Sequence, residues 1–215
     1  MGSDKSVEEE QCCCTLTSEE IGVLKYIFET ILETGRIPTI REMRFALKKS
    51  DDYIIETLDK LEKNDILLRK RGTQEILSIY PLSLTPTEHQ IILKNEKRLF
   101  AMCAVDSLGM PIMFNRNAKI ISQCEKCKQE IAIEIKDEKI VWTSNPTIMI
   151  WSPARQIAPA AETCCPMVDF FCSKDHLQEW IKENPGLIGK ISEIEEAFPG
   201  IKRCWRPYCE ILGFR

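Results

Sequence analysis

The sequence predicts an α+β fold, in which an N-terminal winged-helix-like domain is followed by a mixed β-sheet domain flanked by helices. Apolar residues recur at helical spacing in the first third of the chain, and alternating β-branched segments dominate later. The 215 residues suffice for a small domain plus a larger one. The expected parts are a disordered cysteine-containing tail (1–14), the winged-helix-like domain (15–82), a linker (83–96) and an α+β domain (97–215).

Three helices and a hairpin are expected in the first domain. "TLTSEEIGVLKYIFETILETG" predicts a helix capped by Thr17 or Ser18 and ended by Gly35. "RIPTIREMRFALKK" predicts a second helix after Pro38, and "SDDYIIETLDKLEKNDI" a third. "ILLRKRGTQEILSIYPL" then predicts a hairpin that turns at Gly72.

A winged helix usually binds DNA through its third helix, and the charges here oppose that use. Residues 51–65 carry six acidic residues against two lysines, and only "RKR" at 69–71 is basic. The whole chain has a formal net charge of -4. We therefore expect no nucleic-acid partner, although a winged-helix regulator that senses metal through cysteines remains an alternative.

The second domain is expected to alternate helices and strands. "LFAMCAVDSLGMPIMF" predicts a buried helix, and strands are predicted at "AKIISQC", "EIAIEIKDEKIVWTS", "PTIMIWSP" and "VDFFCS". "SKDHLQEWIKENPG" predicts a helix capped by Ser173. "KISEIEEAFPG" predicts a last short helix.

Eleven cysteines are the most unusual feature of the composition. The acidic N-terminus is no secretory signal, and no run approaches the roughly 18 apolar residues of a membrane span. We therefore expect a cytoplasmic protein that does not enter a membrane and whose thiols stay reduced. Reactive thiols or soft-metal binding then explain the cysteines better than disulfides. The alternative for any single cysteine is a small buried hydrophobic residue.

Cys103 and Asp106 form the first candidate site. On a helix, positions three residues apart share a face, and an apolar setting raises the pKa of both groups. The carboxyl can then stay protonated near neutral pH and donate a proton. The alternative is a core cysteine beside an aspartate that caps a turn.

Other cysteines suggest a second metal site. "CEKC" (Cys124 and Cys127) is half of a zinc site, so a structural zinc is an option there. The other half is expected from the pair Cys164 and Cys165 or from the pair Cys204 and Cys209. Of the adjacent Cys164 and Cys165, only one is expected to point toward a given site. The run Cys12–Cys14 is either inert or a relay for soft metal, and His89 and His176 are interpreted as isolated structural or surface residues.

Two longer segments together resemble the organomercurial lyases (alkylmercury lyases, MerB family). "KRLFAMCAVDSLGMPIMFNRNAKIISQC" (97–124) resembles their central R-L-aromatic-A-x-C-A-x-D motif. "CCPMVDFFCSKDHLQEWIKENPGLIGKISEIEEAF" (164–198) is similar to their cysteine, V-x-F-F strand and Trp-bearing helix. The resemblance covers roughly residues 18–200, and it implies that 97–215 is the catalytic domain.

The resemblance implies a reaction and a set of residues. Cys103 and Cys165 would bind mercury as thiolates, and Asp106 would carry the proton that cleaves the carbon–mercury bond and would also contact the Hg(II) product. Cys124 would be structural. Cys127 and Cys164 go beyond the family's core pattern and are candidates for a structural or secondary role. No cofactor would be required, and cellular thiols or a mercuric reductase would accept Hg(II). The alternative is a thiol-rich protein on the same fold that binds or processes another soft metal or organometallic compound.

Overall fold

The computed structural model of the protein describes residues 16–94, 96–154 and 159–214. The expected tail (1–14), with Cys12–Cys14, lies outside the described residues. The helices are α1 (Ser18–Thr34), α2 (Ile40–Leu47), α3 (Asp51–Lys63), α4 (Ala104–Met113), α5 (Ala160–Thr163), α6 (Lys174–Glu183) and α7 (Ile194–Leu212), with a 3₁₀ turn at Cys165–Met167. The strands are β1 (Leu67–Arg69), β2 (Ile76–Ile79), β3 (Leu82–Ser83), β4 (Gln90–Leu93), β5 (Arg98–Ala101), β6 (Ala118–Gln123), β7 (Glu130–Lys136), β8 (Lys139–Thr143), β9 (Met149–Pro153), β10 (Asp169–Phe171) and β11 (Gly189–Glu193). None of the described helices combines the length and apolar character that crossing a membrane requires.

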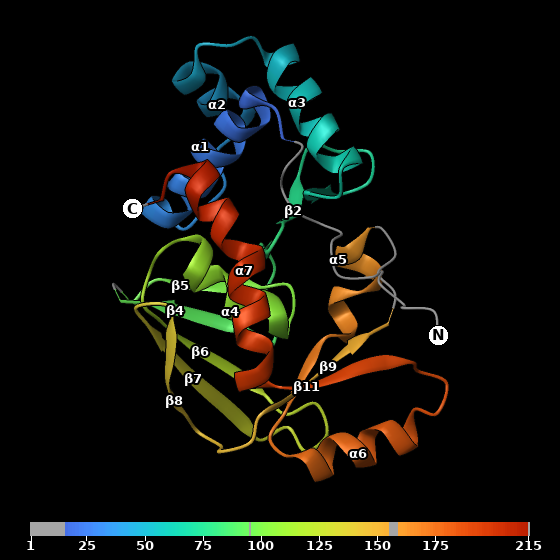
Figure 1. The fold of residues 1–215 in the computed structure, drawn as a ribbon. Coiled ribbons are helices and arrows are strands. Elements are labelled where there is room, and N and C mark those ends of the chain that lie inside the picture. Colours follow the sequence, from blue (N-terminus) through green and yellow to red (C-terminus); the bar gives the residue numbers. More distant parts are fainter. Residues whose placement is uncertain (1–15, 95, 155–158, 215) are drawn as a thin grey trace, which may run out of the picture.

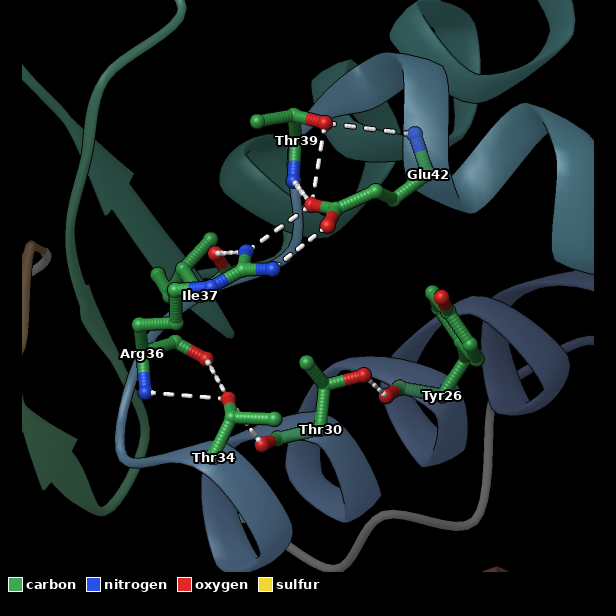
Figure 2. A network of polar contacts seen from close by, with 7 residues as sticks. All are labelled: Tyr26, Thr30, Thr34, Arg36, Ile37, Thr39 and Glu42. Atoms are coloured by element: carbon green, nitrogen blue, oxygen red, sulfur yellow. Dashed lines mark hydrogen bonds and ion pairs between the residues drawn. The ribbon is translucent and has the colours of Figure 1, made fainter.

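The first three helices begin where the sequence predicts, because each has a side-chain cap. Thr17 and Thr39 form capping boxes, in which each threonine accepts a hydrogen bond from a backbone N–H and a glutamate bonds back to it. Figure 2 shows the box of α2, where the Glu42 carboxylate also receives both terminal nitrogens of Arg36. These contacts fix the turn between α1 and α2.

The hairpin at Gly72 forms as predicted, but its strands join a larger sheet. The β1–β2 pair continues through β3 into the order β1-β2-β3-β5-β4-β6-β7-β8. Arg69, the first residue of the basic "RKR", pairs with Asp59 and Glu62 of α3 at 2.5 Å each. The winged-helix description and the domain boundaries stay predictions, because the hairpin and the later strands share one sheet.

The expected linker at 83–96 contains an inner strand of this sheet. Residues 90–93 form β4, which lies between β5 and β6 with antiparallel pairing on both sides. The expectation of a linker is therefore wrong for these four residues. All pairings among the described strands are antiparallel, including the small second sheet β10-β9-β11, so the sheets are not of mixed direction. The α+β class is confirmed.

Two further expectations about elements are wrong in part. The start of "LFAMCAVDSLGMPIMF" is strand β5 rather than helix, and α4 begins only after Cys103, whose backbone is extended with φ -156°. "KISEIEEAFPG" contains β11 and then a helix that continues to Leu212 through two prolines. Strand β11 pairs along all five residues with β9, so pairing with a distant segment overrides the local helical pattern.

Helices α4 and α7 pack together beside the large sheet, as Figure 1 shows. Gly109 of α4 permits this contact, because a Cβ there would overlap the indole ring of Trp205 on α7. The C-terminal end of α7 reaches α1 (Figure 1). There the rings of Phe28 and Phe214 both pack edge-on against Phe114, at centroid distances of 5.6 and 5.4 Å. The N-terminal helices thus share one apolar core with the sheet.

Candidate active site

Cys103 is placed by the junction between β5 and α4. It is the N-cap residue of α4, and its Sγ accepts a hydrogen bond from the Asp106 backbone N–H at 3.3 Å. The next residue, Ala104, donates its N–H to the Val168 carbonyl at 3.0 Å, which ties this junction to the segment that follows Cys165. Cys103 is only 4% exposed. Burial raises the pKa of its thiol well above the usual value, and the neighbouring Cys165 and Asp106 raise it further.

Asp106 lies in the first turn of α4 and is 1% exposed. Burial raises the pKa of its carboxyl to about 7, although the side chains of Cys103, Tyr80 and Cys165 favour the charged form. Among the described residues, Asp106 Oδ1 has no hydrogen-bond partner. The protein therefore holds a carboxyl group in an apolar place where it changes protonation near neutral pH, with one oxygen left free for a further contact.

Cys165 comes from a distant part of the chain, on the 3₁₀ turn between α5 and β10. Its Sγ donates toward Asp106 Oδ2 at 3.7 Å, and it is 6% exposed. One ligand atom each of Cys103, Asp106 and Cys165 lies within 4.8 Å of the others. The adjacent Cys164 is also buried but is not part of this group, and burial raises the pKa of its thiol to about 11.

Tyr80 is a neighbour of the site that sequence reasoning missed. Burial raises the pKa of its phenol well above the usual value, and the negative charge of Asp106 raises it further. Its ring packs on that of Trp205 at 4.9 Å between centroids, and Trp205 fills the space above Gly109 of α4. Tyr80 precedes a loop whose Pro81 carbonyl accepts the Met102 N–H at 3.0 Å. The phenol thus stays neutral beside the carboxyl and can donate a hydrogen bond to it.

The three convergent groups have complementary chemistry. Two thiols can bind one soft metal ion, and coordination removes their protons even in a buried place. A carboxyl with a pKa near 7 can both accept a proton from a thiol and donate it again at neutral pH. Mutual distances below 4.8 Å allow these steps without large movement.

A second group of potential ligands lies elsewhere. Cys124, Cys127, Cys172 and His176 also have ligand atoms within 4.8 Å of one another. The interpretation of His176 as isolated is therefore wrong, and so is the expectation that Cys164/Cys165 or Cys204/Cys209 completes the "CEKC" pair. The spacing C-x-x-x-H between Cys172 and His176 is the sequence signal that was overlooked.

The remaining residues singled out from the sequence lie outside both groups. Cys204 is exposed on α7, while Cys209 is buried on the same helix and its Sγ donates to the Phe214 carbonyl at 3.4 Å. His89 is buried, and its Nδ1 lies 2.9 Å from Ser122 Oγ. Burial lowers the pKa of His89 to about 4, so it is a neutral structural histidine, as interpreted from the sequence.

Comparison with known proteins gives matches over most of the chain. The family model described as alkylmercury lyase matches residues 82–204. An alkylmercury lyase of Bacillus cereus is 27% identical over 179 residues, which cover 81% of this chain and 78% of that protein. One of Streptomyces lividans is 23% identical over 184 residues, which cover 85% and 80%.

A solved structure has a similar fold. The crystal structure of the mercury-bound form of MerB2 superposes with a TM-score of 0.78 and covers 91% of this chain and 94% of that chain, at 24% identity. The family model spans more than half of the chain and includes Cys103, Asp106 and Cys165. On this evidence, the chain belongs to the alkylmercury lyase family.

Proposed function

We propose that this protein cleaves carbon–mercury bonds of small organomercurials by protonolysis, with Cys103 and Cys165 as the mercury ligands and Asp106 as the proton carrier. The observation that carries the proposal is the convergence of these three side chains, which come from two distant segments, in a buried place. Family membership supports the substrate class.

The first step is ligand exchange. An organomercury thiolate meets one of the two thiols, which replaces the original thiolate on mercury, and the departing thiolate takes up the proton that the cysteine loses. Mercury is a soft metal and prefers sulfur, so this exchange needs no other activation. Burial disfavours free thiolates here, because it raises the pKa of Cys103, and metal coordination overcomes that penalty.

The second step breaks the carbon–mercury bond. The other cysteine transfers its proton to the ionised Asp106 and binds mercury as a thiolate. Two sulfur donors raise the electron density on the metal-bound carbon, and Asp106 then delivers the proton to that carbon. The products are a hydrocarbon and Hg(II) held by two thiolates. The distance of 3.7 Å from Cys165 Sγ to Asp106 Oδ2 supports transfer between these groups.

Hg(II) held this way must leave by exchange with other thiols. We therefore place the protein in the cytosol, where thiols are reduced, and expect cellular thiols or a mercuric reductase as the acceptor. All cysteines among the described residues are free thiols, which agrees with a reducing location.

The test is methane release from methylmercury in excess free thiol. Wild type is compared with Cys103→Ser, Cys165→Ser and the matched neighbour Cys164→Ser. We expect methane from wild type and Cys164→Ser, and a loss of at least about 100-fold in the other two. If wild type binds mercury but releases no methane, the lyase proposal is wrong, and the protein is instead a carrier of soft metal on the same fold.

A further inference from the structure

Four side chains converge where the large sheet meets the small one, apart from the three residues of the candidate active site. Cys124 and Cys127 lie in the turn between β6 and β7, Cys172 directly follows β10, and His176 lies in the first turn of α6. The Cys124 Sγ–His176 Nδ1 and Cys127 Sγ–Cys172 Sγ distances are both 3.7 Å. Cys172 Sγ lies 3.0 Å from His176 Nδ1.

The two distances of 3.7 Å match the edges of a metal-centred tetrahedron, and the Cys172–His176 pair, at 3.0 Å, would have to widen by about 0.5 Å to hold a metal. With Zn–S bonds of about 2.3 Å and a Zn–N bond of about 2.0 Å, tetrahedral angles put two sulfurs about 3.8 Å apart and a sulfur and a nitrogen about 3.5 Å apart. A disulfide would need about 2.05 Å between sulfurs, far less than the 3.7 Å between Cys127 and Cys172. We infer that Cys124, Cys127, Cys172 and His176 form a Cys₃His zinc site.

The backbone around Cys124 is shaped like a metal-binding turn. The Cys124 carbonyl accepts the Lys128 N–H at 2.8 Å, and Lys128 has a left-handed φ of 58° that closes the turn. The amides of Cys127 and Cys172 are directed at the Cys124 sulfur. Such N–H donors stabilise a metal-bound thiolate and orient it, which is the usual outer shell of a zinc–sulfur site.

The four ligands close the coordination sphere, so the site is structural rather than catalytic. It joins the two sheets: two ligands belong to the β6–β7 turn and two to the segment after β10. The Glu125 N–H already bonds to the Phe170 carbonyl at 2.9 Å across the same boundary. Cys165 lies on the turn just before β10, so the metal would hold its segment against the large sheet, whose strand β5 leads into Cys103.

The experiment measures metal content. The protein is produced in medium with zinc, purified with a reductant and without chelators, and its zinc is counted by mass spectrometry. We expect about one zinc per chain, falling at least 10-fold in Cys127→Ser and His176→Ala. Cys204→Ser, an exposed cysteine outside the cluster, is the matched control and should keep its zinc, as should Cys103→Ser and Cys165→Ser.

A cobalt titration covers the case in which the variants fail to fold. Wild type stripped of metal should give the visible absorption of tetrahedral thiolate-bound Co(II) with one equivalent, and Zn(II) should abolish it. Folded, reduced wild type with less than about 0.1 zinc per chain and no such spectrum would overturn the inference. So would loss of zinc from Cys103→Ser instead of Cys127→Ser. Neither readout depends on methane release, so the proposed function and this site can fail separately.

Discussion

Replacing Asp106 with asparagine removes a buried ionisable group and keeps the size of the side chain. Burial raises the pKa of Asp106 from 3.8 to about 7, so between these pH values the folded chain holds a proton that the unfolded chain has released. Each pH unit of this interval corresponds to about 1.4 kcal/mol. Ionising Asp106 within the fold therefore costs about 4 kcal/mol, an order-of-magnitude figure.

The sign follows from the protons bound. Because the folded state binds more protons, this group lowers stability as pH rises from about 4 to about 7, and the loss is complete above pH 7. Between pH 5 and pH 8, wild type should lose about 2–3 kcal/mol more stability than Asp106→Asn. The Cys103 thiol does not disturb the comparison, because burial holds its pKa well above 9.0 and it stays protonated from pH 5 to pH 8.

Urea unfolding with a reductant at pH 5, 6, 7 and 8 measures this difference. Asp52→Asn is the matched control for the same change of side chain, because Asp52 is exposed on α3 and lies outside the core. A stability difference between wild type and Asp106→Asn that does not change with pH would refute the reasoning, because Asp106 would then be ionised at no cost. The same variant should still bind mercury but release methane about 100- to 10,000-fold more slowly. Full cleavage by Asp106→Asn would remove its assigned role.

Two predictions concern packing. Gly109→Ala should lower the free energy of unfolding by about 1–3 kcal/mol, because the new Cβ overlaps the Trp205 indole. Gly22→Ala, which lies in open space on α1, should be neutral or stabilising. The urea midpoints of both variants measure this, and a Gly22→Ala variant at least as destabilised as Gly109→Ala would contradict it. Phe28→Ala should cost about 3–5 kcal/mol and lower the unfolding midpoint of the whole molecule, because its ring packs against Phe114 in a shared core. Helical circular dichroism and tryptophan fluorescence should therefore shift together, since all four tryptophans (Trp142, Trp151, Trp180 and Trp205) lie outside the N-terminal helices. An unchanged fluorescence transition would show that the N-terminal helices unfold on their own.

Local signals identified most of the helices and the chemistry-bearing motifs. Capping residues and 3.6-residue spacing placed α1, α2, α3 and α6 close to their observed bounds, because these signals act within a few residues. They failed where pairing is long-range. Strand β4 was expected in a linker, and β5 and β11 within helices, since each strand is stabilised by partners elsewhere in the chain.

The same division holds for the site. The residues alone singled out Cys103 with Asp106 and the "CEKC" pair, because residue types and short spacings carry that information. The choice of Cys165 over Cys164 came only from the resemblance to the family. Only the tertiary structure decided which side chains meet. Cys165 reaches Asp106 across 59 positions of the chain, and His176 reaches Cys124 across 52. The pKa of Asp106 was likewise decided by the fold, because desolvation depends on the atoms that surround the carboxyl and not on its neighbours in sequence.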